Sequence, residues 1–142
     1  MTDPMGSWPA TIPHAAEAAA ARWPDASGLI VGDRSWSFSE LWDDARASAS
    51  AMLASGVGAG DRIAIWAPNI REWILAALGA QTVGATVVPL NTRFKGQEAG
   101  DILRRSRARL LFVPADFLGP CRLQRPQQPA DADGLVLHAP GL

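Results

Sequence analysis

The chain has 142 residues, of which 48% are hydrophobic, and a formal net charge of -1 at pH 7. This length suits one domain, and the nearly neutral charge provides no basic surface for nucleic acid or anionic lipid. The single cysteine, Cys121, excludes an internal disulfide and any zinc site built from several cysteines.

The amino-terminal residues predict a disordered lead-in over residues 1–10, followed by a helix. Asp3 and Pro4 stand where an export signal would have basic and apolar regions, so we expect a cytoplasmic protein. Thr11 is a favourable helix N-cap, and an alanine-rich run continues from it to Trp23.

The next segment predicts a hairpin that leads into a second helix. Two short strands are expected at residues 28–31 and 35–37, around Gly32 and Asp33. Ser37 and Glu40 then have the spacing of a capping box, in which each side chain accepts a hydrogen bond from a backbone N–H at the helix start. We expect this helix to end at Gly56 and to bury Leu41, Ala45, Ala49, Met52 and Leu53.

Residues 61–93 predict a strand, a helix and a second strand, which together form a βαβ unit. The strands are expected at 62–66 and 86–88, and the helix at 70–83, with Asn69 and Glu72 capping its start. A strand that returns in parallel is usually buried on both faces, which explains the unbroken apolar run after residue 85. The expected buried stripe of the helix consists of Trp73, Ile74, Ala77, Leu78 and Ala80 or Gln81.

A third helix is expected at 98–106 and a further strand at 110–113. Residues 73–92 carry no formal charge over twenty positions, but their glycines, Pro89 and polar residues favour a buried helix and strand over a membrane span. We therefore expect no transmembrane segment.

Two groups of charged residues suggest sites, and each has a simpler explanation. Asp43 and Asp44 suggest metal binding, but adjacent helix positions point apart, so a solvated surface is favoured. A phosphate site is suggested by four arginines, Arg104, Arg105, Arg107 and Arg109. We prefer the simpler explanation that the helix dipole favours cations near the carboxyl end of a helix.

Four blocks of sequence carry a resemblance to a known family. They are residues 36–41 (WSFSEL), 56–64 (GVGAGDRIA), 68–69 (PN) and 84–93 (GATVVPLNTR). In this order and spacing they resemble the amino-terminal part of the adenylate-forming, or AMP-binding, enzymes, and within these the bacterial fatty acyl-CoA ligases. The resemblance covers about residues 11–118 and implies an α/β fold: a helix and hairpin, then a partial parallel βαβαβ layer that is incomplete as a domain.

The resemblance implies activation of a fatty acid with ATP and Mg²⁺ to an acyl adenylate, followed by thioester formation with CoA. This sequence contains no Ser/Thr/Gly-rich loop ending in Pro-Lys-Gly, no Tyr-Gly-x-Thr-Glu segment and no tyrosine. Lys95 stands at the start of the third helix, where the family commonly has a capping Ser or Thr, so it does not replace the catalytic lysine. We therefore expect no catalytic, cofactor-binding or metal-binding residue here, and no bound cofactor.

The family's motif residues that are present suit scaffold roles. Capping explains Glu40, packing explains Gly84, the end of a strand explains Pro89, and a turn explains Asn91. The scaffold positions are Glu40, Asn69, Gly84, Pro89, Asn91 and Arg93. Asn91 and Arg93 are the first of these to test for function.

The resemblance stops near Leu118, and residues 119–142 are rich in proline and glutamine. We expect an unrelated, disordered tail there, such as a shifted reading frame produces, with Cys121 and His138 incidental. Two hypotheses follow: a truncated acyl-CoA ligase that is inactive alone, or a non-catalytic α/β module that binds a protein partner through an unpaired sheet edge. A complementary ligase fragment is the partner considered, and nucleic acid is not expected.

Overall fold

The structure is a computed structural model that describes residues 10–114, 117 and 135–139. Residues 1–9 of the expected lead-in, and residues 119–134 and 140–142 of the expected tail, lie outside the described residues. The elements in chain order are α1 (Ile12–Arg22), β1 (Ser27–Val31), β2 (Arg34–Ser37), α2 (Phe38–Ala54), β3 (Arg62–Ile65), α3 (Arg71–Thr82), β4 (Thr86–Pro89), α4 (Gly96–Ser106), β5 (Leu110–Pro114) and β6 (Leu135–Ala139).

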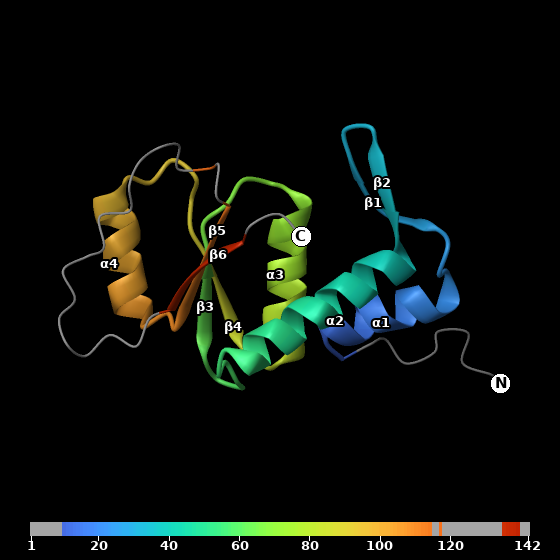
Figure 1. Cartoon of the computed structure of the whole chain (residues 1–142), viewed down its shortest axis with the longest axis horizontal. Helices are drawn as coiled ribbons and strands as arrows, with labels where there is room; N and C mark the ends of the chain where they lie inside the picture. The colour runs from blue at the N-terminus through green and yellow to red at the C-terminus, as the bar shows by residue number, and fades with distance from the viewer. Residues whose placement is uncertain (1–9, 115–116, 118–134, 140–142) are drawn as a thin grey trace.

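The strands form two separate sheets (Figure 1). Strands β1 and β2 pair in antiparallel fashion as a hairpin, whereas β3 to β6 form a parallel sheet in the order β4-β3-β5-β6. The βαβ unit is confirmed, because β3 and β4 are parallel neighbours joined through α3. The α/β fold with its hairpin and partial βαβαβ layer is confirmed as well.

Helices cover both faces of the parallel sheet. Along β3, Ile63 and Ile65 join the core on the side of α2 and α3, whereas Ala64 joins the core on the side of α4. Strand β5 alternates in the same way: Leu110 belongs to the first core and Leu111 to the second. Successive side chains of a strand point to opposite faces, so these apolar runs fit strands covered on both sides.

Helices α2 and α3 approach each other at a glycine. A Cβ atom at Gly79 would lie 2.6 Å from the Ser48 hydroxyl oxygen and 3.0 Å from the Ala49 backbone nitrogen. This close approach explains why Ser48, a polar residue, is buried in α2. The prediction of Leu53 on the buried face is wrong, because Leu53 is 58% exposed and residues 45, 48, 49 and 52 form the stripe that faces α3.

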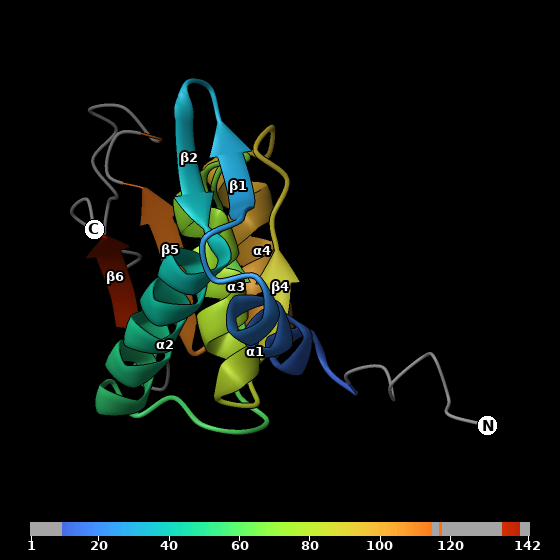
Figure 2. The same ribbon diagram turned by 90° about the vertical axis from the view of Figure 1, so that its right-hand side faces the viewer.

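The start of α2 has the predicted capping box. The Ser37 hydroxyl accepts a hydrogen bond from the Glu40 N–H at 3.2 Å, and the Glu40 carboxylate accepts one from the Ser37 N–H at 2.8 Å. Glu40 therefore has the scaffold contact that its position predicts. Figure 2 shows the hairpin rising from this helix start, above α1.

The capping box supports a quantitative prediction. We expect Ser37→Ala to lower the free energy of unfolding by about 1 kcal/mol, because one N–H at the helix start loses its acceptor. Urea denaturation followed by circular dichroism measures the change. The control is Ser39→Ala in the first turn of the same helix, which removes a hydroxyl outside the box. Equal effects of the two substitutions would argue against the cap as the cause.

The predicted cap of α3 is wrong. Its N-cap is Ile70, which makes no side-chain capping hydrogen bond, and Asn69 lies one residue before it. The Ile70 N–H donates to the Pro68 carbonyl at 2.8 Å, and this tight turn places Asn69 outside the helix. Ala77 and Ala80 of the predicted buried stripe are confirmed, whereas the other buried residues of the helix are Leu75, Ala76 and Gly79.

Strand β4 is only partly buried, contrary to the expectation that both of its faces are covered. Thr86 and Pro89 are exposed, and Val87 and Val88 are half-buried. The reason is its position: among the described strands β4 pairs with β3 alone, so it forms an edge of the parallel sheet.

The expectation of a tail without a packed element is corrected at residues 135–139. This segment forms β6, which pairs in parallel with β5 from Leu110↔Leu135 to Pro114↔Ala139. The short apolar run at 135–137 supplies a strand where the edge of β5 offers backbone partners.

Candidate functional site at the carboxyl ends of the strands

The carboxyl ends of β3, β4 and β5 lie at one edge of the sheet because these strands are parallel. This edge is where ligands usually bind in open α/β sheets. Trp66 follows β3 there, and the Trp66 N–H donates to the Phe112 carbonyl at 2.9 Å. Leu90 follows β4, and its N–H donates to the Ile65 carbonyl at 2.9 Å.

Trp66 fixes the loop that leaves β4. Its indole Nε1 donates to the Asn91 carbonyl at 3.1 Å, and its ring meets Phe117 edge to face with centroids 6.2 Å apart. The Asn91 side chain then turns the chain, since its Oδ1 accepts from the Arg93 N–H at 2.9 Å. Only 6% of Trp66 is exposed. Sequence reasoning missed this anchor, although an aromatic residue directly after a buried strand was its visible signal.

The structure brings some of the predicted scaffold residues together and separates others. Pro89 ends β4, and Asn69, Asn91 and Arg93 belong to the segments that follow β3 and β4, at the carboxyl edge. Gly84 lies at the other end of β4, with φ of 78° beside Ala59, and its conformation suits glycine.

A second cluster joins the hairpin to α2 and α3. Arg71, at the start of α3, forms an ion pair with Asp44 of α2, and its guanidinium lies 5.0 Å from the ring centroid of Trp36 in β2. Arg34 contacts the same ring at 4.8 Å. The Arg71 side chain is 13% exposed, so the pair is partly shielded from water. These contacts hold Trp36, and with it the hairpin, against the helices.

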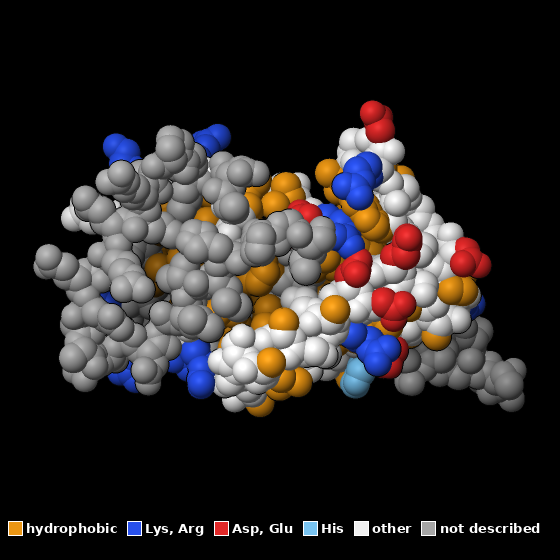
Figure 3. All heavy atoms as spheres, in the orientation of Figure 1, with side chains coloured by type: hydrophobic (Ala, Val, Ile, Leu, Met, Phe, Trp, Pro, Cys, Tyr) orange, Lys and Arg blue, Asp and Glu red, His pale blue; other side chains and the backbone are white. Residues whose placement is uncertain are grey.

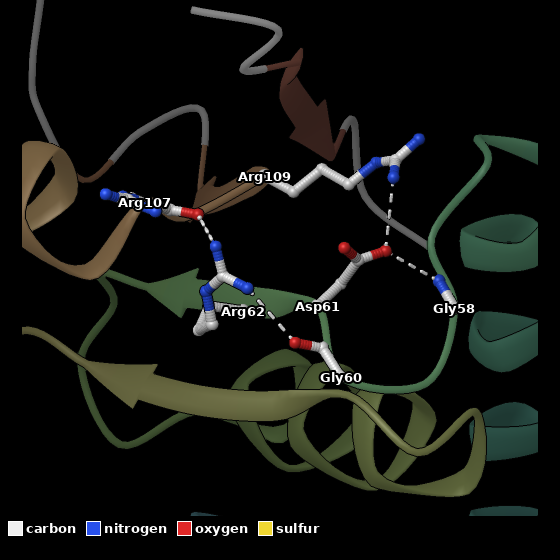
Figure 4. A network of polar contacts seen from close by, with 6 residues as sticks. All are labelled: Gly58, Gly60, Asp61, Arg62, Arg107 and Arg109. Atoms are coloured by element: carbon white, nitrogen blue, oxygen red, sulfur yellow. Dashed lines mark hydrogen bonds and ion pairs between the residues drawn. The ribbon is translucent and has the colours of Figure 1, made fainter.

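The amino ends of the strands carry a polar network (Figure 4). The Arg62 guanidinium donates to the carbonyls of Ser106 at 2.9 Å, Arg107 at 2.8 Å and Gly60 at 3.1 Å. Two of these carbonyls lie at the end of α4, so Arg62 from β3 satisfies acceptors that the helix leaves free. In the same network, Asp61 accepts from the Gly58 N–H at 2.8 Å and pairs with Arg109 at 3.3 Å.

The charged groups considered as sites have partners within the fold. Asp101 pairs with both Arg104 and Arg105 on α4, and Arg107 ends that helix in the left-handed conformation with φ of 51°. Asp43 lies 3.9 Å from Arg46, and Asp44 pairs with Arg71. These contacts support the structural interpretations of both groups.

The side chains at the carboxyl edge favour positioning over bond-breaking chemistry. The Trp66 indole and the Asn91 side chain form hydrogen bonds, and Asn69 and Arg93 carry groups able to form them, but these residues do not form a nucleophile and base pair. Among residues 10–114, 117 and 135–139, no three His, Cys, Asp or Glu residues come together as metal ligands. Within the described part of the chain, no helix has the length and hydropathy of a membrane span.

Residues 16–139 match the protein family described as "AMP-binding enzyme". The match extends through β6, beyond the point where the sequence motifs end. Among curated proteins, a methyl-dioxo-octahydroindenyl propanoyl:CoA ligase of Mycobacterium tuberculosis is 44% identical over 109 residues, which are 77% of this chain and 22% of that protein. The putative acyl-CoA synthetase YngI of Bacillus subtilis is 30% identical over 77% of this chain and 20% of its own length.

Solved structures with the same fold include the N-terminal subdomain of Klebsiella oxytoca NpsA in complex with anthranilyl-AMSN. It aligns with a TM-score of 0.68 and 27% identity over 71% of this chain and 27% of that one. The chain spans about a fifth of the length of the Mycobacterium tuberculosis and Bacillus subtilis relatives.

Proposed function

Because the chain belongs to the family of AMP-binding enzymes, we propose that it forms the amino-terminal part of an acyl-CoA ligase and has no adenylating activity by itself. The proposed reaction of the whole ligase joins a carboxylic acid, such as a fatty acid, to AMP from ATP with Mg²⁺, and then transfers the acyl group to CoA. The observation that carries this proposal is the family match over residues 16–139. The structural similarity to the N-terminal subdomain of Klebsiella oxytoca NpsA supports it.

The proposed contribution of this chain is structural. Trp66 and Asn91 fix the loops at the carboxyl edge, where hydrogen-bond donors can orient a ligand held by the rest of a ligase. The sequence contains no Pro-Lys-Gly loop to hold the ATP phosphates, and its single lysine, Lys95, is the N-cap of α4. The adenylation step therefore depends on residues that relatives carry in the remaining four-fifths of their length.

We expect the purified chain to catalyse no exchange of labelled pyrophosphate into ATP above background. The assay contains Mg²⁺ and a panel of acids: medium-chain and long-chain fatty acids, and the ring-bearing propanoate named in the Mycobacterium tuberculosis relative. That relative, assayed in parallel, is the positive control. Carboxylate-dependent exchange by this chain alone would overturn the claim that it cannot adenylate.

A non-catalytic binding module is the second candidate, and the edge position of β4 favours it. Strand β4 pairs only with β3 among the described strands, and its outer edge presents backbone N–H and carbonyl groups to a strand of a partner. This candidate predicts a stable monomer that binds a protein without any effect on adenylation. Sedimentation shows whether the wild-type chain is a monomer, and a binding assay shows whether it binds a protein. The exchange assay, run beside them, shows whether that binding affects adenylation and so separates the two candidates.

A further inference from the structure

The described part of the chain divides its charge unevenly along the sequence. Residues 10–54 contain six Asp or Glu residues and three Arg residues, which give a formal net charge of -3. Residues 55–114 contain eight Lys or Arg residues and four Asp or Glu residues, which give +4. The whole chain carries only -1, so its overall charge conceals two segments of opposite sign.

These two segments contribute opposite ends of the molecule. Figure 1 places the hairpin, α1 and the start of α2 at one end of the longest axis, and α4 at the other. Figure 2 looks from the hairpin end, with α4 on the far side of α3. On the face shown in Figure 3, most acidic side chains gather over the hairpin and the helices below it. The separation of charge along the sequence is therefore also a separation in space.

The basic end consists of exposed arginines at the carboxyl end of α4 and the start of β5. They are Arg104, Arg105, Arg107 and Arg109. The side chains of Arg104 and Arg105 are 74% and 81% exposed, and both pair with Asp101. Asp61 is the described acid that pairs with Arg109. The helix dipole favours these cations but does not neutralise them, so an excess of positive charge faces solvent.

The acidic end has exposed carboxylates that the fold does not use. Asp33 lies in the turn between β1 and β2, and Asp43 lies on α2. The Asp43 side chain is 69% exposed and lies 3.9 Å from Arg46 of the same helix. Glu40 and Asp44, by contrast, have a capping contact and an ion pair with another helix. Exposed ion pairs stabilise a fold little, so the charges of Asp33 and Asp43 are available to another molecule.

We propose that the basic end of one copy of this chain docks on the acidic end of a second copy. The small overall charge leaves little repulsion between copies, while their opposite ends attract each other. Because the two copies contribute different surfaces, the contact is heterologous and leaves a free end on each side for further copies. The charge distribution carries this proposal, which goes beyond the proposed function and does not depend on any reaction.

Sedimentation velocity of the full chain at two salt concentrations tests the proposal. The Debye length falls from about 30 Å at about 10 mM salt to about 3 Å at about 1 M, so salt screens the attraction between exposed ends. We expect self-association at low salt, with a Kd that rises at least about tenfold at high salt. A monomer at both concentrations would overturn the proposal. Association that persists at high salt would also overturn it, because apolar contacts would then hold the copies together.

Two double variants each remove charge from one end. Arg104→Gln/Arg105→Gln acts at the basic end, and Asp33→Asn/Asp43→Asn acts at the acidic end. Each is expected to raise Kd at low salt at least about fivefold, because one of the two complementary surfaces loses charge. The matched control is Arg46→Gln, which removes an exposed cation from the acidic end. It should leave Kd unchanged or lower it, and an equal rise in Kd would contradict the assignment of the two ends.

A mixture of the two double variants separates docking from misfolding. The chain with glutamines at 104 and 105 keeps its acidic end, and the chain with asparagines at 33 and 43 keeps its basic end. Their equimolar mixture should therefore form a heterodimer with a Kd within about threefold of the wild-type value. Circular dichroism checks that both variants are folded. Failure of two folded variants to associate, or self-association retained by both of them, would overturn the head-to-tail contact.

Discussion

Gly79→Ala is expected to lower the free energy of unfolding by about 1–3 kcal/mol, the range for overpacking a close-packed interior. The added methyl group would lie 2.6 Å from the Ser48 hydroxyl oxygen and 3.0 Å from the Ala49 nitrogen, so α2 and α3 must move apart. Alanine's better helix propensity offsets only part of this cost. Urea denaturation with an unchanged m-value measures the loss of stability.

Gly100→Ala is the matched control for this prediction. Gly100 also lies within a helix, but a Cβ atom there meets no heavy atom within 4 Å. We expect this substitution to raise the free energy of unfolding by about 0.4–1 kcal/mol, because it reduces the freedom of the unfolded chain. A stabilising effect at both positions would show that the helix contact at Gly79 is looser than the structure indicates.

Arg62→Ala is expected to lower the free energy of unfolding by about 2–3 kcal/mol. The substitution removes three hydrogen bonds from one guanidinium, to the carbonyls of Gly60, Ser106 and Arg107. A hydrogen bond to a charged group contributes about 1.5–3 kcal/mol, but the three share one side chain and water can replace part of them. Denaturant titration of the purified variant measures the total loss.

Arg62→Lys tests the geometry of this contact. A lysine keeps the charge but lacks the planar fork that reaches carbonyls in two loops, so it should recover less than half of the lost stability. The control is Arg105→Ala on α4, whose exposed ion pair with Asp101 predicts a change within about 0.5 kcal/mol. If Arg62→Lys recovered all of the lost free energy of unfolding, the charge of Arg62 and not its planar fork would explain the stabilisation.

Local signals in the sequence predicted the elements well. The Ser37 and Glu40 pair predicted the start of α2, and Gly56 predicted its end with a positive φ of 80°. Thr11 predicted the cap of α1. These features depend on residues a few positions apart, which is why one sequence contains the information.

Contacts between distant segments were not predictable in the same way. Leu53 fits the helical spacing of a core residue, yet the closeness of α3 at Gly79 decides which face of α2 is buried. Strand β4 has the composition of a central strand, but its position at the edge depends on the order of all four strands.

The candidate site likewise combines features that local patterns predict with contacts between distant segments. The turn at Asn91 was predicted from a local pattern and is present. The hydrogen bond from Trp66 to the Asn91 carbonyl joins residues 25 positions apart, and no local pattern encodes it. The run at 135–137 is apolar in the sequence, but its pairing with β5 requires the folded sheet.

The strand order also has a consequence for synthesis on the ribosome. Strand β3 lies between β4 and β5, so a nascent chain that has emerged through Pro89 can form one side of the sheet while the other side of β3 stays open. Strand β5 ends at Pro114, 25 residues later. At about 5–20 residues per second, this edge stays open for roughly 1–5 seconds, the interval in which a chaperone would protect the nascent chain from aggregation.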